Sequence, residues 1–415
     1  PDPIPFTKVY LLTDLSQNGF QPEHLATLAE LLKRYAAGLG RITPRPRGSR
    51  LSPEVRAMLE DALAAAESAF KDCEDSPPTQ EEMLVFANGC YAVGRHSEAS
   101  DVYRSILKDE PSNADARFNL GLTYLRLRIP EDAVREFTDV LAQHPLLAEA
   151  FYQRGNGNDD LGQTERALAD YGRAIELDPE YVHAMYNRGI LLAQAGRHQE
   201  AVAQFDKVND ISPNISNAYL NRGASLDELG LHVEAIISYT KAAGLNPENS
   251  LALFNRARTN YYLGHLHEAL ADYSEVVRLT PYDAEAFNNR GLTYDALGDY
   301  ENAIEDFDAA LELRPSFAEA HSNRGAVLEV MGDLGGALEE YRRSLEANPR
   351  LASAHYNAAR LYSRTGDVAA CLNHLDKVLE IAPQWADDAA QDEHLAWALE
   401  MRNLRRENDG QAGEG

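Results

Sequence analysis

The chain has few cysteines, little positive charge and no long apolar run among its 415 residues. Its three cysteines, Cys73, Cys90 and Cys371, are far apart and have no paired spacing, which disfavours a disulfide scaffold or a zinc ribbon and fits the reducing cytoplasm. No apolar run approaches about 18 residues, so we expect no segment that spans a membrane. No basic stretch precedes an apolar core near the start, so we expect no signal peptide. These absences predict a cytoplasmic protein without a membrane partner.

Positive charge is scarce and unevenly placed. The chain has 39 Lys and Arg against 66 Asp and Glu, which gives a formal net charge of −27. Phosphate binding needs a basic face, so this balance argues against a nucleic-acid partner. Residues 1–50 hold seven basic and four acidic residues, so a basic arm precedes an acidic body. The segment RITPRPRGSR at 41–50 is either a solvated linker or an arm that occupies an acidic binding surface and regulates access to it.

Residue patterns that carry chemistry are missing. The sequence has no phosphate-binding loop, no zincin motif and no nucleophile elbow. Its 12 histidines are scattered, and no group of His, Cys and Asp has the spacing of a metal site. We therefore predict no catalytic residues, no cofactor, no metal and no enzymatic activity.

What the sequence has instead is a period of 34 residues. Nine prolines follow one another at that spacing without a slip, at Pro111, Pro145, Pro179, Pro213, Pro247, Pro281, Pro315, Pro349 and Pro383. Twelve residues before each proline lies an alanine, and four residues after that alanine lies an aromatic; Cys371 and Leu375 take these places in the last unit. A period of this length indicates a stack of structural repeats rather than several domains.

A 34-residue unit with small, aromatic and proline residues at these offsets resembles the tetratricopeptide repeat. The clearest copy is AEAFNNRGLTYDALGDYENAIEDFDAALELRPSF at 284–317. The resemblance implies an all-α fold, a right-handed superhelical solenoid of antiparallel helix pairs, and a scaffold that binds protein. It predicts nine repeats over 80–385, with the bounds 80–113, 114–147, 148–181, 182–215, 216–249, 250–283, 284–317, 318–351 and 352–385.

Each unit has the pattern of two amphipathic helices. In 284–317 the first helix carries Phe287 and Gly291 on one stripe, and the second carries Phe307 on its inner stripe. Gly298 marks the turn between them, where a left-handed conformation is expected, and the proline ends the second helix. Stacked units bury a continuous core that no single unit forms alone.

Residues 1–79 are predicted to form an N-terminal helical extension. We expect helices at about 22–37 and 53–72, the second started by Ser52 as its cap and by Pro53. Thr79 and Glu82 then have the spacing of a capping box that opens the first repeat.

The other end is expected to close the solenoid. Residues 386–404 read as a capping helix, whose Leu395, Trp397 and Leu399 cover the last repeat. Residues 405–415 read as a disordered tail.

One position of the first helix is almost always an asparagine. With each repeat numbered from 1, position 6 falls on the face that lines the concave groove in similar proteins. In repeats two to nine it holds Asn119, Gln153, Asn187, Asn221, Asn255, Asn289, Asn323 and Asn357. A side-chain amide offers a donor and an acceptor, which match one peptide unit of an extended chain. The repeat region of the O-linked N-acetylglucosamine transferases has a similar row. We predict a ladder that binds a peptide, or else hydrogen bonds between neighbouring helices.

The other groove-facing positions are rich in acids and aromatics. As further site residues we select Tyr152, Tyr186, Asp159, Asp160, Asp227, Glu228 and Asp295. An acidic surface with aromatic side chains favours a basic or neutral extended segment, although excess acid can serve solubility alone. No repeat has lysine at position 5, which argues against the two-carboxylate clamp of chaperone-binding relatives.

Position 7 is arginine in six consecutive repeats, the third to the eighth. Position 23 of the second helix is Asp or Glu in four of those six. We predict that these four arginines pack their stems on the repeat and pair with the acid at position 23.

The stretch RGNGNDDLG at 154–162 departs most from the pattern. The register places it in the second half of a first helix, and its spacing lacks the glycine and glutamate that a calcium loop needs. Gly157 is expected to weaken this helix by roughly 0.5–1 kcal/mol relative to alanine. We therefore predict a soft joint here, with Asp159 and Asp160 on the groove face.

Two classes of function follow from these patterns. The first is a non-catalytic module whose groove binds an extended segment of another protein. The second is an assembly scaffold or self-associating subunit that uses outer or terminal surfaces, with a homo-oligomer as one outcome. The sequence does not name the partner.

Overall fold

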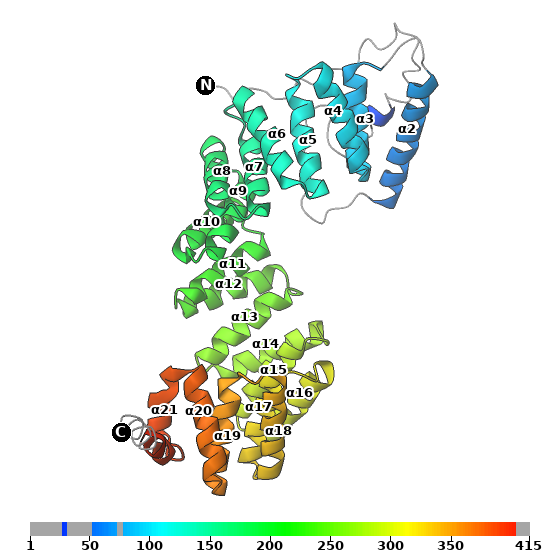
Figure 1. Cartoon of the computed structure of the whole chain (residues 1–415). Helices are drawn as coiled ribbons and strands as arrows, with labels where there is room; N and C mark the ends of the chain where they lie inside the picture. The colour runs from blue at the N-terminus through cyan, green and yellow to red at the C-terminus, as the bar shows by residue number, and fades with distance from the viewer. Residues whose placement is uncertain (1–26, 31–51, 73–77, 404–415) are drawn as a thin grey trace, which may run out of the picture. The chain divides into compact units, whose positions relative to one another are not determined.

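The computed structural model describes residues 27–30, 52–72 and 78–403. All regular structure in these ranges is helical (Figure 1), which confirms the all-α fold. The basic segment at 41–50, most of the helix expected at 22–37 and the tail at 405–415 lie outside the described residues. None of the described helices is long and apolar enough to cross a membrane.

The chain divides between Ser212 and Pro213 into two compact units. The first contains α2 (Pro53–Asp72) and four helix pairs, each inside one predicted repeat. These are α3 (Gln80–Val93) with α4 (His96–Asp109), α5 (Ala114–Leu127) with α6 (Pro130–Gln143), α7 (Ala148–Asp160) with α8 (Thr164–Leu177), and α9 (Val182–Gln194) with α10 (His198–Ile211).

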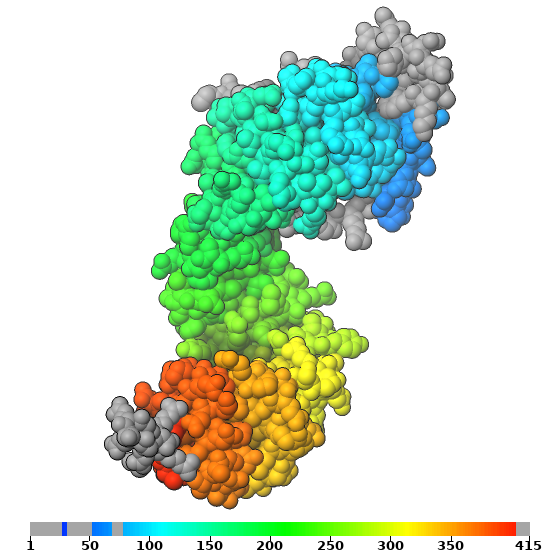
Figure 2. All heavy atoms as spheres, viewed as in Figure 1, coloured from blue at the N-terminus to red at the C-terminus, as the bar shows by residue number. Residues whose placement is uncertain are grey.

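The second unit contains five helix pairs and a C-terminal cap. The pairs are α11 (Ser216–Glu228) with α12 (His232–Leu245), α13 (Ser250–Tyr262) with α14 (Leu266–Leu279), α15 (Ala284–Ala296) with α16 (Tyr300–Leu313), α17 (Ala318–Val330) with α18 (Leu334–Ala347), and α19 (Ala352–Thr365) with α20 (Val368–Ile381). Figure 2 shows that side chains fill the space between neighbouring pairs within each unit.

The turn inside each pair lies at position 15. It has a positive φ in all nine repeats, and it is glycine in every repeat except the second. Gly298 has φ 79°, as the LGDY turn predicts, whereas Arg128 takes the same left-handed conformation at φ 62°. The register of the repeats is therefore preserved even where the turn lacks its glycine.

A small residue of the first helix lies against a ring of the second helix within most repeats. A methyl group built on Gly291 would lie 2.8 Å from Cε1 of Phe307, and one on Gly121 would lie 2.8 Å from Cζ of Phe137. Both rings are fully buried. Absence of a side chain on one helix thus lets the ring of the other fill the interface.

The four predicted arginine–acid pairs are confirmed. They are Arg154–Asp170 at 2.6 Å, Arg256–Asp272 at 2.7 Å, Arg290–Asp306 at 2.6 Å and Arg324–Glu340 at 3.0 Å. The first three are bidentate, since Nε and Nη2 each donate to one carboxylate oxygen. The acids are buried, so these are structural pairs rather than surface contacts.

The stretch at 154–162 forms a helix as the register requires. α7 continues to Asp160 and ends at the left-handed Gly162. Gly157 is buried, and a methyl group on it would lie 2.8 Å from a methyl of Val134. Asn158 is also buried, and its Nδ2 donates to Asp170 at 2.9 Å. Close packing therefore explains the glycine at 157, and the hydrogen bond to Asp170 explains the buried asparagine at 158.

The soft joint is a prediction about motion, and it has a direct measurement. We expect amide hydrogen exchange to be faster at 156–161 than at 292–297 of α15, because Gly157 lowers helix propensity and Asn158 replaces an apolar residue of the packing stripe. Exchange followed by mass spectrometry compares the two segments in one sample. Equal protection would contradict the joint.

The N-terminal start signals are confirmed. α2 begins at Pro53, and the Val55 amide donates to Ser52 Oγ at 3.3 Å. At α3 the Glu82 amide donates to Thr79 Oγ1, and the Thr79 amide donates to the Glu82 carboxylate at 2.7 Å. The buried Leu28 and Leu63 approach Gly89 of α3, so both segments before the first repeat cover it.

The C-terminal cap is broken rather than continuous. α20 is followed by η3 (Pro383–Trp385) and α21 (Ala386–Gln391), and helix resumes only at 396–403. Asp392 lies in the break, where it accepts a hydrogen bond from the His394 amide at 2.8 Å and from Tyr356 Oη at 3.1 Å. Leu395 is fully buried and, with Trp397 and Leu399, packs on the last repeat as predicted.

Candidate binding face

In the second unit the first helices α11, α13, α15, α17 and α19 contact one another in order. Consecutive second helices make at most marginal contact among the described residues. A stack whose first helices lie closer together than its second helices curves toward the first helices. We call the surface formed by positions 2, 5, 6, 9, 12 and 13 of these five helices the first-helix face.

Amides at position 6 in four of the repeats donate hydrogen bonds to the preceding repeat. Asn323 Nδ2 donates to Asn288 Oδ1 at 2.9 Å, and Asn357 Nδ2 lies 3.5 Å from Ser322 Oγ. In the first unit Asn119 Nδ2 donates to Asn88 at 2.9 Å, and Asn187 Nδ2 donates to Tyr152 and to Asn156. These bonds match the alternative in which the row joins neighbouring helices.

Burial separates the members of the row further. Asn119 is fully buried, and Gln153 is buried and accepts from Asn156 at 3.0 Å. A ligand does not reach either side chain in this conformation, so we leave both out of the proposed binding surface. Asn187 and the five asparagines of the second unit, Asn221, Asn255, Asn289, Asn323 and Asn357, are half-buried.

Asn255 and Asn289 differ from the other amides of the second unit. Their side chains form no hydrogen bond with the described residues, although their backbone oxygens accept from Thr259 and Thr293. The reason lies in the preceding repeat, where positions 5 and 9 are Leu220 and Ala224 for Asn255, and Phe254 and Arg258 for Asn289. None of these four side chains offers an acceptor.

In the second unit the acids at position 12 accept a hydrogen bond from the tyrosine at position 24 where the repeat has one. Tyr239 Oη donates to Asp227 at 2.8 Å, and Thr259 of the next repeat donates to the same carboxylate at 2.7 Å. Tyr341 Oη donates to Glu329 at 3.0 Å, and Arg364 of the next repeat pairs with that carboxylate. Asp227 is therefore a structural residue, and we do not include it in the proposed ligand contacts.

Asp295 occupies the same position 12 but has neither donor. Position 24 of its repeat is Phe307, which has no hydroxyl, and the next repeat places Val327 and Val330 where the others place Thr259 and Arg364. The half-buried carboxylate accepts no hydrogen bond and pairs with no cation among the described residues. Burial raises its pKa above the ordinary aspartate value. A group in this state favours a ligand that supplies a donor.

Two tyrosines lie on the first helix of the repeat that precedes Asn289 and Asp295. Tyr261 is half-buried at position 12 of the preceding repeat, and its pKa is raised, first by burial and then by the charge of Asp295. Tyr262, at position 13, is 73% exposed. Glu228 is exposed on α11. The middle of the first-helix face, formed by α13 and α15, thus combines two amides without partners, the carboxylate of Asp295 and two aromatic rings.

The site residues selected in the first unit have other surroundings. Tyr152 packs against the rings of Tyr171 and Tyr181, and Tyr186 packs edge-on against Phe205. Asp159 and Asp160 are exposed at the end of α7. These residues belong to the first unit alone, and we keep them apart from the face described above.

A histidine–glutamate pair between α17 and α18 gives a pH prediction. His321 Nδ1 lies 2.7 Å from Glu340 Oε2, and its Nε2 lies 3.0 Å from the Pro315 oxygen. The hydrogen bond with Glu340 raises the pKa of His321. Burial opposes ionisation of Glu340, but the hydrogen bond from His321 and the charge of Arg324 hold its pKa below the ordinary value.

A histidine whose pKa rises on folding stabilises the fold below its unfolded pKa of about 6.5 and loses that contribution as pH rises through the folded pKa. We expect the thermal midpoint of His321→Gln to fall further below that of the native protein at pH 6 than at pH 8.5. His267→Gln, an exposed histidine of α14, is the control. The same deficit at both pH values would contradict the ion pair.

No group of three or more His, Cys, Asp or Glu side chains in the described ranges has the arrangement of a metal site. Models of the tetratricopeptide repeat family match residues 84–148, 152–214, 216–249, 284–317 and 352–384, which together make up more than half of the chain. A search of the curated proteins finds no match.

Solved structures share the repeat over part of the chain. YrrB, described as a TPR protein with an unusual peptide-binding site, is 28% identical over 44% of this chain and 95% of its own, with a TM-score of 0.41. MamA is 27% identical over 40% of this chain and 96% of its own, with a TM-score of 0.38. A repeat protein from Parabacteroides merdae is 23% identical over 60% of this chain and 98% of its own, with a TM-score of 0.44.

Proposed function

This chain belongs to the tetratricopeptide repeat family, whose members generally serve in protein interaction, and from that membership we propose that it binds an extended segment of another protein without catalysis. The proposed binding surface is the first-helix face of α13 and α15, centred on Asn255, Asn289 and Asp295. The observation that carries the proposal is that these three half-buried polar side chains lack partners among the described residues, whereas most equivalent side chains elsewhere are hydrogen-bonded.

The chemistry of these side chains indicates the chemistry of the partner. Each asparagine amide can donate to a peptide carbonyl and accept from a peptide N–H, so successive repeats hold successive parts of an extended backbone. Asp295 only accepts when ionised, so it favours a lysine, an arginine or a backbone N–H of the partner. Tyr261 and Tyr262 add flat apolar area beside it. The partner segment is therefore extended, and basic or neutral.

The test selects peptides from a random displayed library with the full chain and then compares variants in binding titrations. We expect Asp295→Asn to weaken selected peptides about 10–100-fold, because a charge-assisted hydrogen bond contributes about 1.5–3 kcal/mol. Asn255→Ala together with Asn289→Ala is expected to weaken them about 10–100-fold as well, at roughly 1 kcal/mol per hydrogen bond.

Asn373→Ala is the matched control, because Asn373 is an exposed asparagine on the second helix α20. It should bind like the native protein. If the selected peptides bind all of these variants as tightly as the native protein, the proposed surface is ruled out, whatever the peptide sequences are.

Self-association is the second candidate, and one observation favours it. Val233 and Ile237 lie at i and i+4 of α12, and each is 63% exposed. Apolar side chains that share one helix face and remain exposed mark a contact surface when they gather. Light scattering of the full chain at two concentrations, compared with Ile237→Lys, tests this candidate. A mass that equals the monomer at both concentrations rejects it.

A further inference from the structure

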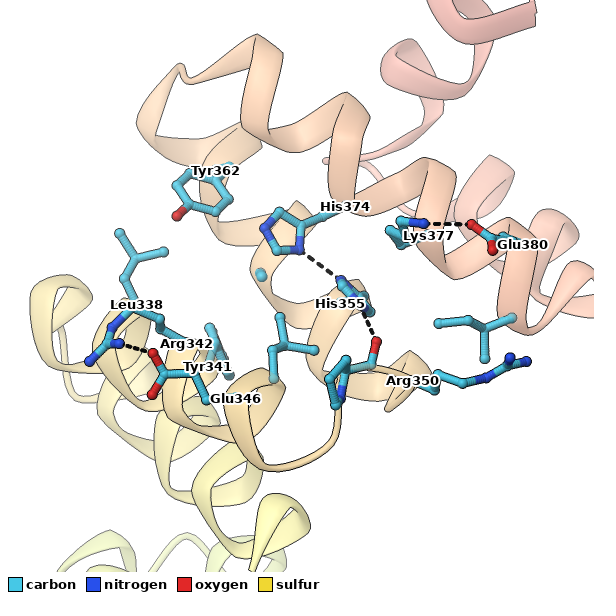
Figure 3. A pocket seen from close by; sticks show the side chains of 14 residues that line it. Leu338, Tyr341, Arg342, Glu346, Arg350, His355, Tyr362, His374, Lys377 and Glu380 are labelled. Carbon is cyan, nitrogen blue, oxygen red and sulfur yellow. Dashed lines mark hydrogen bonds and ion pairs between the residues drawn. The ribbon is translucent and has the colours of Figure 1, made fainter. Parts of the chain in front are cut away.

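Two histidines of the last repeat contact each other in the wall of a cavity. The cavity has a volume of about 610 Å³ and is lined by α18, α19 and α20 (Figure 3). His355 comes from α19 and His374 from α20, and their Nδ1 atoms are 2.9 Å apart. Figure 3 shows both rings among the side chains that line the cavity.

The proton positions on the two rings follow from their partners. His355 Nε2 lies 3.1 Å from the backbone oxygen of Pro349, which only accepts, so Nε2 carries the hydrogen. The Nδ1 of neutral His355 therefore has a free lone pair, and the Nδ1 of His374 must donate to it. One proton lies between two nitrogens from different helices.

This arrangement has the support that metal-binding histidines receive in known sites. A ligating histidine almost always donates its other ring N–H to a carbonyl or carboxylate, which fixes the tautomer and the ring orientation. Pro349 does this for His355, and the ring of Tyr362 stacks on His374 at 5.5 Å between centroids. Burial lowers the pKa of both rings, that of His374 to about 4, so both are neutral at pH 7.

We infer that His355 Nδ1 and His374 Nδ1 form a two-histidine site for a divalent late transition-metal ion. The ion binds both Nδ1 atoms from beside the line that joins them and displaces the shared proton, which moves through solvent to Nε2 of His374, so binding at neutral pH releases no net proton. Imidazole nitrogen suits copper, nickel and zinc. The remaining coordination positions are open to the cavity and are filled by water, because no third His, Cys, Asp or Glu joins the pair within the described residues.

The distance between the nitrogens favours some geometries over others. With metal–nitrogen bonds of about 2.0–2.1 Å, nitrogens 2.9 Å apart subtend an angle of about 90° at the metal. That is the angle between neighbouring ligands in square-planar and octahedral complexes, which Cu²⁺ and Ni²⁺ adopt. A tetrahedral Zn²⁺ ion would need the nitrogens to separate by about 0.4 Å. We therefore expect Cu²⁺ to bind most tightly, as the general order of affinity also predicts.

The residues at positions 4 and 23 also pair in two other repeats, where they join the two helices of the repeat. The histidine contact is a variant of this structural pair. Positions 4 and 23 are His321 and Glu340 in the eighth repeat, and Arg117 and Glu136 in the second, where the charged pair is 2.9 Å apart. In each case the residue at position 4 also contacts the carbonyl of the proline before its repeat. Among the described repeats only the last places histidine at both positions.

The experiment uses the full chain without a histidine tag and one equivalent of CuCl₂. Electron paramagnetic resonance should show splitting from two imidazole nitrogens, and calorimetric titration with NiCl₂ should show one site of matching stoichiometry. We expect His374→Gln and His355→Gln each to lower the Ni²⁺ affinity at least tenfold. His321→Gln removes the histidine at position 4 of the neighbouring repeat, which pairs with Glu340, and should bind metal as the native protein does.

Two results would overturn the inference. One is a copper spectrum of the native protein with fewer than two coupled nitrogens, which needs no variant and so does not depend on how the variants fold. The other is Ni²⁺ affinity that is unchanged in both His355→Gln and His374→Gln. Neither result bears on Asp295, so the peptide-binding proposal is judged separately.

Discussion

Replacement of Arg290 by methionine should lower the free energy of unfolding by about 3–5 kcal/mol, the cost of leaving a buried charge without its partner. Arg290 donates through Nε and Nη2 to the two oxygens of Asp306 at 2.7 and 2.6 Å. The Asp306 side chain is only 7% exposed, so water cannot replace the lost guanidinium. The same guanidinium lies over the rings of Phe287 and Tyr294, and its removal loosens that packing as well.

Two further variants decide whether burial is the cause. Arg278 pairs with Glu275 at the surface of α14, where both side chains are well exposed, and Arg278→Met should cost less than about 1 kcal/mol. Arg290→Met combined with Asp306→Leu removes both charges and should recover most of the loss. Urea unfolding followed by circular dichroism measures all three. A loss below 1 kcal/mol for Arg290→Met alone would show that water reaches Asp306.

These pairs are also where the sequence was most informative. The period of 34 residues fixed the position of every repeat, and the structure has a helix pair inside each one. Because position 7 and position 23 face each other in one repeat, they do so in all, and four pairs followed from counting alone. Start signals at Ser52 and Thr79 were equally local, since each depends on residues within one helical turn.

Contacts between repeats were harder to predict, because the same position has different neighbours in each repeat. The asparagine row is uniform in sequence, but its hydrogen bonds depend on whether the preceding repeat places an acceptor at position 5 or 9. Asp295 looks like Asp227 along the sequence, and two changes distinguish them: phenylalanine replaces tyrosine at position 24, and Val327 replaces the donor Thr259 in the next repeat. Those signals were present in the sequence and would have separated the two acids.

The histidine contact shows a different limit. His355 and His374 are 19 residues apart and have none of the spacings by which metal sites are recognised in a sequence. They meet because positions 4 and 23 face each other across the pair of helices, which only the repeat register reveals.

The division between Ser212 and Pro213 has no counterpart in the sequence at all, because Pro213 follows the same period as the other prolines.

The second large effect is expected at Gly223, where helix propensity and packing predict opposite results. Alanine is a better helix former than glycine by about 1 kcal/mol, so propensity alone predicts that Gly223→Ala stabilises α11. A methyl group there, however, would lie 2.6 Å from Cε1 and 2.7 Å from Cδ1 of Tyr239. That ring is fully buried, and its hydroxyl is held by Asp227 at 2.8 Å. Because the ring cannot move aside, the two helices must separate.

We therefore expect Gly223→Ala to lower the free energy of unfolding by about 1–3 kcal/mol, the usual effect of an extra methyl group in a packed core. Gly244→Ala is the matched control, since Gly244 is in α12 and no atom lies within 4 Å of the added methyl. That variant should stabilise by about 0.5–1 kcal/mol. Opposite signs in urea unfolding would show that close approach of the helices selects glycine at position 8. If both variants stabilise, Tyr239 has room to shift, and the glycine at this position does not determine how the helices pack.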